Sequence, residues 1–223
     1  MWREAGLVAA KDLRVEWRSR VAVNQVVPFS LVVLLLFAFA LDPDRGFLRR
    51  AAPGLYWVAV LLSALLVVQR SFAAETVDGG RDGLRVAGLD PAAIFLGKGA
   101  AVAAVLVLLE VVLAAGVALL YGAGFGGGPL LVPLTCLLAT AGVVAPGMVY
   151  GALASGVRAR ETLLPLLFLP AVAPVMIAAT RAFEAAIDHS PGEGWRWCGL
   201  LGVIAVAYTA LGLVVFEPLL EDP

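Results

Sequence analysis

Six apolar runs, each long enough to cross a lipid bilayer, constrain this chain more than any other feature. About 20 apolar residues in a helix, rising about 1.5 Å each, span a hydrocarbon core about 30 Å thick. The runs cover residues 21–41, 52–69, 92–121, 129–155, 162–181 and 197–216. Strands of a transmembrane barrel are only about ten residues long and alternate in polarity, which these runs do not. The pattern predicts an all-α polytopic membrane protein with six transmembrane helices.

The polar segments between the runs are too short to fold separately. Of the 223 residues, 61% are hydrophobic and only 15% are charged, whereas a soluble domain of this length has about half and about a quarter. We therefore expect residues 1–223 to form a single transmembrane domain.

The basic residues divide unequally between the two sides of the expected bundle. With the N-terminus inside, eleven Lys and Arg residues fall on the inner side and five on the outer side. Segments on the cytoplasmic side of a membrane carry the excess of Lys and Arg. The chain is thus predicted to lie in a bacterial inner membrane with both termini in the cytoplasm.

Residues 1–20 have the pattern of an amphipathic helix. At 100° per residue, one face is apolar and includes Trp2, Leu13 and Trp17, while Arg14 and Arg18 lie on the opposite face. A basic face opposite tryptophans suits a helix that lies in the inner interface against anionic lipid head groups. The alternative is a solvated helix that leads into the first span.

A charged, glycine-rich hairpin separates the second and third runs. Residues 70–91 read RSFAAETVDGGRDGLRVAGLDP, and the expected orientation places them in the cytoplasm. Its acidic side chains could meet basic groups of a soluble partner, and its glycines permit tight turns. The residues we assign to a docking site are Arg70, Phe72, Glu75, Asp78, Gly79, Asp82 and Leu84. The alternative is an ordinary solvated connection.

The sequence offers no site for a nucleotide, a metal or a directly bound cofactor. The nearest approach to a phosphate-binding loop, around Lys98, lacks the upstream glycine and the following hydroxyl residue. His189 is the only histidine, and Cys136 and Cys198 are expected to be free thiols in apolar segments. No basic patch suggests nucleic acid binding. The chain is predicted to be non-catalytic, and any ATP must be used by another chain.

Glu110 is the ionisable residue that the third run carries near its middle. A carboxylate at this depth costs several kcal/mol unless it is neutralised or paired, and such residues often belong to a substrate or proton path. The alternative is a neutral glutamic acid that bonds between helices. An ion-coupled carrier that uses Glu110 therefore remains a second functional hypothesis.

Several motifs spread along the chain resemble one family of membrane proteins. The stretch from Arg50 to Leu66 is similar to the second-span signature of CcmB-type proteins, the B subunit of the cytochrome c maturation heme exporter. The similarity continues through the hairpin to Lys98, although Gln69 stands where family members often have glutamate. The positions outside the hairpin that carry it are Arg50, Pro53, Gly54, Trp57, Pro146, Pro170 and Pro174.

This resemblance implies an ABC-2-like permease that uses ATP through a soluble ABC ATPase subunit. The implied partners are a heme-handling membrane subunit, a small membrane peptide subunit and, indirectly, a periplasmic heme chaperone. Heme would be a substrate of the complex, and the hairpin would meet the ATPase. A permease of another ABC-2 type exporter, or a purely structural assembly subunit, would have a similar layout.

Overall fold

The computed structural model describes residues 1–20, 22–41, 45–77, 89–124, 128–155 and 160–221, and every regular element in these ranges is helical. The N-terminal elements are α1 (Trp2–Ser19), the π-helix η1 (Ala22–Val26) and α2 (Val27–Ala40). The remaining elements are α3 (Arg45–Val77), α5 (Pro91–Tyr121), α6 (Leu131–Ser155), α7 (Arg160–Ile187) and α8 (Pro191–Glu221).

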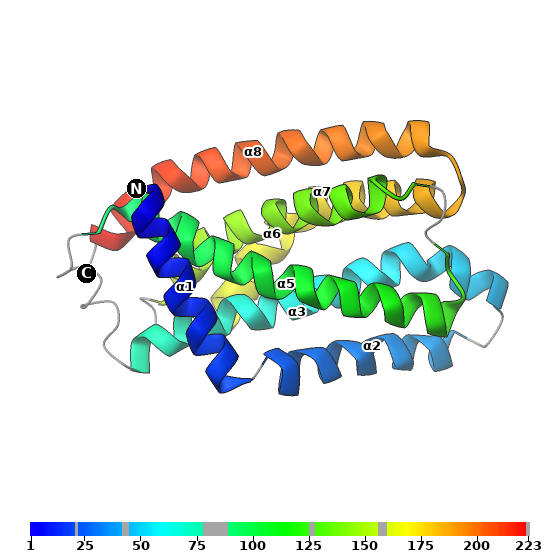
Figure 1. The fold of residues 1–223 in the computed structure, drawn as a ribbon, viewed down its shortest axis with the longest axis horizontal. Helices are drawn as coiled ribbons and strands as arrows, with labels where there is room; N and C mark the ends of the chain where they lie inside the picture. Colours follow the sequence, from blue (N-terminus) through cyan, green and yellow to red (C-terminus); the bar gives the residue numbers. More distant parts are fainter. Residues whose placement is uncertain (21, 42–44, 78–88, 125–127, 156–159, 222–223) are drawn as a thin grey trace.

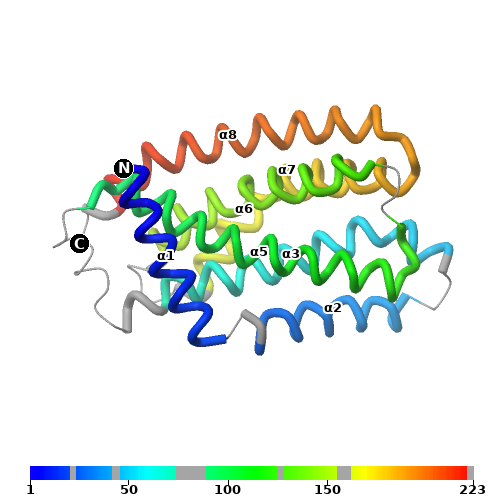
Figure 2. Tube along the Cα trace, viewed as in Figure 1, coloured from blue at the N-terminus to red at the C-terminus, as the bar shows by residue number. Residues whose placement is uncertain are grey.

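Helices α2, α3, α5, α6, α7 and α8 run side by side along the long axis of the molecule, and α1 crosses this direction near one end (Figure 1). Both termini lie at that end, which we call the N/C end; the end that carries the turn between α7 and α8 is the far end (Figure 2). Within the described ranges, five helices are individually long and apolar enough to span a membrane. The pair formed by Trp2–Ser19 and Asn24–Ala40, bent by 54°, makes a sixth candidate. The all-helical, polytopic prediction is confirmed.

Several helices extend beyond the apolar runs that predicted them. α3 begins at Arg45 and ends at Val77. The turn between α7 and α8 is only Asp188–Ser190, so most of the polar segment between the fifth and sixth runs, residues 182–196, is helical. Backbone hydrogen bonding does not stop at the membrane surface, and Ala, Arg and Glu are good helix formers. The polarity of a segment marks where the bilayer ends, not where the helix ends.

Both ends of α5 carry recognisable stop signals. The Asp90 side chain accepts a hydrogen bond from the Ala92 amide at 2.9 Å, and Pro91 occupies the first helical position, where its missing N–H is not needed. Gly122 closes the helix in the left-handed region, with φ of 63°, where glycine is unstrained. These local signals explain why the predicted run at 92–121 matches the helix closely.

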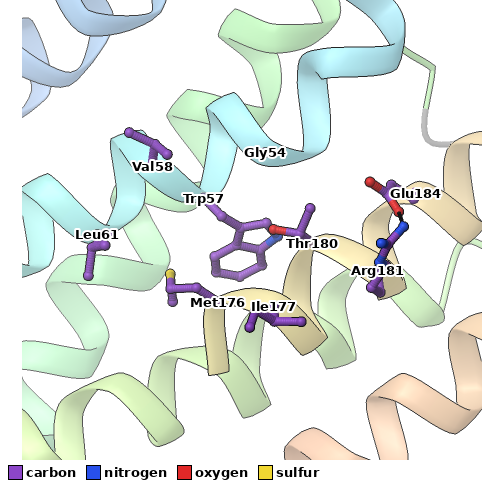
Figure 3. Close-up of a pocket in the computed structure, with 9 residues that line it drawn as sticks. All are labelled: Gly54, Trp57, Val58, Leu61, Met176, Ile177, Thr180, Arg181 and Glu184. Carbon is purple, nitrogen blue, oxygen red and sulfur yellow. Dashed lines mark hydrogen bonds and ion pairs between the residues drawn. The ribbon is translucent and has the colours of Figure 1, made fainter. Parts of the chain in front are cut away.

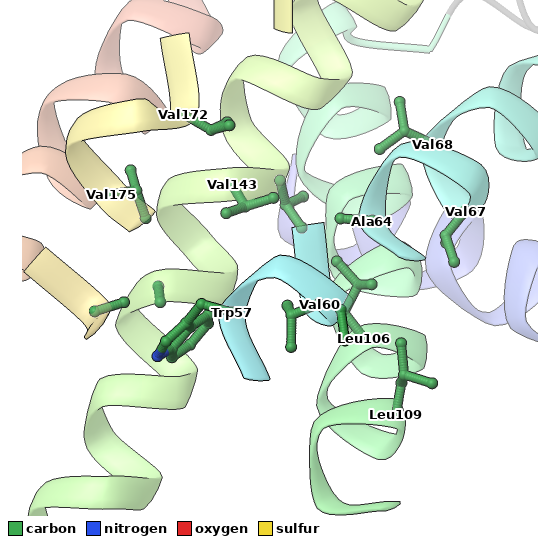
Figure 4. Close-up of a cluster of buried hydrophobic side chains, with 14 of the residues drawn as sticks. Trp57, Val60, Ala64, Val67, Val68, Leu106, Leu109, Val143, Val172 and Val175 are labelled. Atoms are coloured by element: carbon green, nitrogen blue, oxygen red, sulfur yellow. The ribbon is translucent and has the colours of Figure 1, made fainter. Parts of the chain in front are cut away.

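The core lies where α3, α5, α6 and α7 meet (Figure 4). Trp57 and Val60 of α3 are each 1% exposed there. A Cβ at Gly147 of α6 would lie 3.0 Å from Cγ2 of Val68, and one at Gly142 would lie 3.1 Å from Cγ2 of Val175. Small residues allow close approach of membrane helices, whose packing drives their association in lipid.

Candidate functional site

The hairpin predicted to dock a partner begins as a continuation of α3. Arg70, Phe72 and Glu75 belong to the last turns of this helix, which corrects the expectation of a hairpin that starts at residue 70. The other predicted docking residues, Asp78, Gly79, Asp82 and Leu84, lie outside the described residues. The described residues resume at Leu89, and α5 begins at Pro91. Both legs of the connection therefore stand at the N/C end, beside α1 (Figure 1).

Lys98 is the buried charge at this end. It lies two turns into α5, and its side chain is 2% exposed. Its Nζ donates to the backbone oxygen of Ser71 at 3.1 Å and to Oδ2 of Asp12 at 3.4 Å. One ammonium group of α5 thus contacts both α1 and the end of α3. The N-terminal helix is thereby joined to both legs of the connection.

Phe72 covers the other side of the ammonium group. Lys98 Nζ lies 5.1 Å from the centroid of the Phe72 ring, within the range of a cation–π interaction. The ring in turn lies directly against Gly151 of α6, where any added side-chain carbon would overlap it. The contact therefore extends from α5 through α3 to α6.

The face of α1 turned toward the bundle carries both apolar and acidic residues. Ala5 and Val8 are buried, and Asp12 lies on the same face with its side chain 17% exposed. Gly97 of α5 permits this approach, because a Cβ there would lie 2.5 Å from the Ala5 carbonyl oxygen. Asp12 was not predicted from the sequence; its helical spacing from Ala5 and Val8 was the available signal.

The tryptophan face of α1 is mostly exposed, although Trp17 also lines a hollow against α5. Trp2 and Trp17 are 77% and 79% exposed, so they are available to an apolar environment at the side of the bundle. Near α1, Arg70 joins the end of α3 to the π-helix η1, because its Nη1 donates a hydrogen bond to Gln25 Oε1 at 3.1 Å. Lys98 holds α1 against the bundle through its contact with Asp12.

Glu110 occupies a separate polar cluster between α3, α5 and α6. The residue is 2% exposed, and its Oε1 accepts a 2.6 Å hydrogen bond from Thr140 Oγ1. The Tyr56 hydroxyl donates to the Glu110 backbone oxygen at 3.2 Å and lies 3.6 Å from the Cys136 sulfur. Within the described ranges, no basic side chain forms an ion pair with Glu110. The hydrogen bonds of Glu110 therefore link α5 to α6 and α3. Among the described residues, they do not lead on to a series of charged side chains.

The family-motif positions do not gather in one place. Arg50, Pro170 and Pro174 are exposed, whereas Pro53 and Pro146 are buried in helix packing. Gly54 and Trp57 line a groove between α3 and α7, with a volume of about 350 Å³. α7 remains a continuous helix through its prolines.

The isolated histidine and cysteines are also separated from one another. His189 lies in the turn between α7 and α8, and its Nδ1 is 3.0 Å from the Ile187 backbone oxygen. Both cysteines are free: Cys136 lies in the Glu110 cluster, and Cys198 packs beside Leu131 and Ala186.

The sequence of this chain matches one known family. The family described as "CcmB protein" matches residues 4–217, which is nearly the whole chain. The chain belongs to the CcmB family. The resemblance noted in the sequence is confirmed.

Curated relatives agree over similar lengths. This CcmB-family chain is 34% identical over 202 residues to Heme exporter protein B of Escherichia coli (strain K12), a match that covers 90% of each chain. It is 32% identical over 204 residues to Heme exporter protein B of Haemophilus influenzae, covering 92% of this chain and 91% of the relative. For Heme exporter protein B of Pseudomonas aeruginosa, the identity is 29% over 208 residues, and 93% of each chain is covered.

Proposed function

We propose that this chain is the non-catalytic permease subunit of an ABC-type complex, in which ATP hydrolysis by a partner subunit drives heme delivery or release of a loaded heme chaperone. The observation that carries the proposal is the match to the CcmB family over residues 4–217, together with relatives named Heme exporter protein B. Heme is then a substrate of the complex. The fold is accordingly an ABC-2-like permease in a bacterial inner membrane.

The N/C end is the part of the chain suited to meet an ATPase. Both legs of the connection between α3 and α5 reach it, and the sequence between them supplies the acidic residues Asp78 and Asp82. The excess of basic residues on this side favours a cytoplasmic location. We infer that the connection docks on the ATPase and that the N- and C-termini lie on the same, cytoplasmic side.

Motion of the connection would be transmitted through Lys98. Its contacts with Asp12 and Ser71 join α1 and α3 to α5, and Phe72 passes the contact on to α6 at Gly151. A push on either leg therefore acts on four helices together. Three other partners are proposed: a heme-handling membrane subunit, a small membrane peptide and a periplasmic heme chaperone. They would contact the far end and the sides of the bundle.

Charge reversal in the connection tests this proposal. Glu75→Lys combined with Asp78→Lys should release the ATPase from membranes in pull-downs, because two attractive contacts become repulsive. Asp188→Lys, at the far end, is the matched control and should leave co-purification unchanged. Normal recovery of the ATPase with the double variant would exclude this docking surface.

A further inference from the structure

The groove between α3 and α7 is lined by residues of the first half of α3 and the second half of α7 (Figure 3). These halves of the two helices lie toward the far end of the bundle (Figure 1). Its volume of about 350 Å³ falls in the range of small-molecule sites, which begins at about 300 Å³. Gly54 and Trp57 line it from α3, while Met176, Thr180 and Arg181 line it from α7. The lining is mainly apolar, with polar groups at a few points.

Trp57 places an unpaired donor in the wall of this groove. The residue is 1% exposed, and its Nε1 has no hydrogen-bond partner within the described part of the chain. Figure 3 shows the nitrogen edge of the ring turned toward Thr180 on the α7 side. Buried polar groups are normally hydrogen-bonded, and an exception calls for an explanation. A ligand whose hydrogen-bond acceptor enters the groove and meets Trp57 Nε1 would explain this unpaired donor.

Arg181 offers further donors at the rim. Its Nη1 bonds to Glu184 Oε2 at 2.8 Å, and its side chain remains 59% exposed. A guanidinium group has five N–H donors, so one carboxylate leaves several for another anion. The groove therefore combines apolar walls, a buried N–H donor and an exposed cation near the membrane surface. This combination suits an amphipathic anion.

Gly54 leaves one side of the groove open beside the indole. A Cβ built at this position meets no atom within 4 Å. Gly54, Trp57 and Leu61 lie at helical spacing on one face of α3, and all three line the groove. The absent side chain thus leaves a space next to an aromatic ring. A flat, rigid molecule can enter such a space more readily than a branched one.

We propose that this groove binds a porphyrin carboxylate of the heme class, with the flat macrocycle beside Gly54 and Trp57. Its carboxylates accept hydrogen bonds from Trp57 Nε1 and the Arg181 guanidinium. The choice of heme as the ligand rests on the proposed function; the site itself rests on the groove and its donors. An acyl chain of a phospholipid offers no acceptor to the indole. No iron ligand is assigned, so metal-free porphyrin should bind as well as heme.

Porphyrin binding to the full-length chain tests this site. The chain in phosphatidylcholine nanodiscs is titrated with metal-free protoporphyrin IX and, separately, with heme, and porphyrin absorbance and tryptophan quenching are followed. Gly54→Leu fills the groove and should weaken binding by about tenfold or more, equivalent to about 1.4 kcal/mol. Gly199→Leu, at another helical glycine with no atom within 4 Å of an added Cβ, is the matched control and should bind normally.

Two milder variants address the polar contacts. Trp57→Phe keeps an aromatic ring and removes the N–H, and it should weaken binding about three- to tenfold. Arg181→Gln should act in the same direction, whereas Glu184→Gln should not weaken binding. Because these variants leave the groove volume nearly unchanged, they keep the test informative even if Gly54→Leu does not fold.

Other results would overturn the proposal. Absence of porphyrin binding, or equal loss in both leucine variants, removes the site; if the ATPase still co-purifies, the proposed function stands without it. Loss of porphyrin binding in nanodiscs containing phosphatidylglycerol would assign the groove to an anionic lipid. A change of oligomeric state in Gly54→Leu with unaltered porphyrin binding would assign it to a second copy of the chain.

Discussion

At the scale of single residues, Glu110 shows how a costly side chain is accommodated in a membrane bundle. Its carboxyl group is buried, bonded to Thr140 across the α5–α6 contact, and close to the Tyr56–Cys136 pair. Such interhelical hydrogen bonds stabilise membrane proteins by about 1 kcal/mol. The local geometry favours a structural contact between helices over a proton path.

Glu110→Gln should therefore preserve the proposed function, assayed as cytochrome c maturation, because the amide oxygen can still accept the Thr140 hydrogen bond. Glu110→Leu loses that acceptor and should lower the free energy of unfolding by about 1 kcal/mol, measured by denaturation in detergent. Loss of maturation in a stable Glu110→Gln protein would instead support an ion-coupled role.

At Gly151, the neighbouring Phe72 ring leaves no space for a side chain. Gly151→Ala places a carbon where the Phe72 ring lies, and overpacking of this kind costs about 1–3 kcal/mol. We expect a lower melting temperature in detergent than for Gly199→Ala, which adds the same carbon where no atom lies within 4 Å. Equal melting temperatures would show that Phe72 moves aside without cost.

At the scale of helices, a charged contact at Lys98 and a close approach at Gly97 join α1 to the bundle. Lys98 meets Asp12, and Gly97 lets the Ala5–Val8 turn lie against α5. Breaking a buried ion pair costs more than its formation contributes, because one charge is left without its partner. The attachment of α1 is therefore sensitive to substitutions on either helix.

Asp12→Ala should loosen α1, with faster hydrogen exchange of its amides and a loss of about 1–3 kcal/mol in local stability. Lys11→Met is the control, since Lys11 also pairs with Asp12 but is 48% exposed; exposed pairs contribute little. The exchanged pair Asp12→Lys with Lys98→Asp should recover part of the protection. No recovery would mean that packing, and not charge, holds α1.

At the scale of the whole molecule, both termini lie at the end crossed by α1 (Figure 2). An even number of crossings returns the chain to the side on which it began, so this position of the termini agrees with the six crossings predicted from the sequence. The excess of Lys and Arg predicts that this side is the cytoplasm.

Reporter fusions test this orientation. A fluorescent protein at either terminus should be bright, and alkaline phosphatase at either terminus should be inactive, because the phosphatase needs export. A cysteine at position 189, introduced as His189→Cys in a background without the native cysteines, should react with an impermeant thiol reagent from outside. Phosphatase activity at the C-terminus would indicate an odd number of crossings.

Much of the fold followed from the sequence because lipid imposes a strong constraint. A backbone in hydrocarbon must satisfy its own hydrogen bonds, so each apolar run had to be a helix, as α5 and α6 are. Local chemistry at Asp90 and Gly122 also marked the ends of α5. Helix ends outside the membrane were less predictable, because water can hydrogen-bond the backbone of a helix end or of a loop. The start of α3 at Arg45 and the end of α7 at Ile187 are examples.

What the sequence determined by itself was therefore the helical class, the approximate spans and the membership of a family. The tertiary structure alone decided that Lys98 pairs with Asp12, 86 positions away, and that Trp57 faces α7 with an unpaired donor. Helical periodicity defines the faces of each helix, but it carries no information on which faces meet. Those contacts depend on close packing between helices, which small residues such as Gly97 and Gly151 permit.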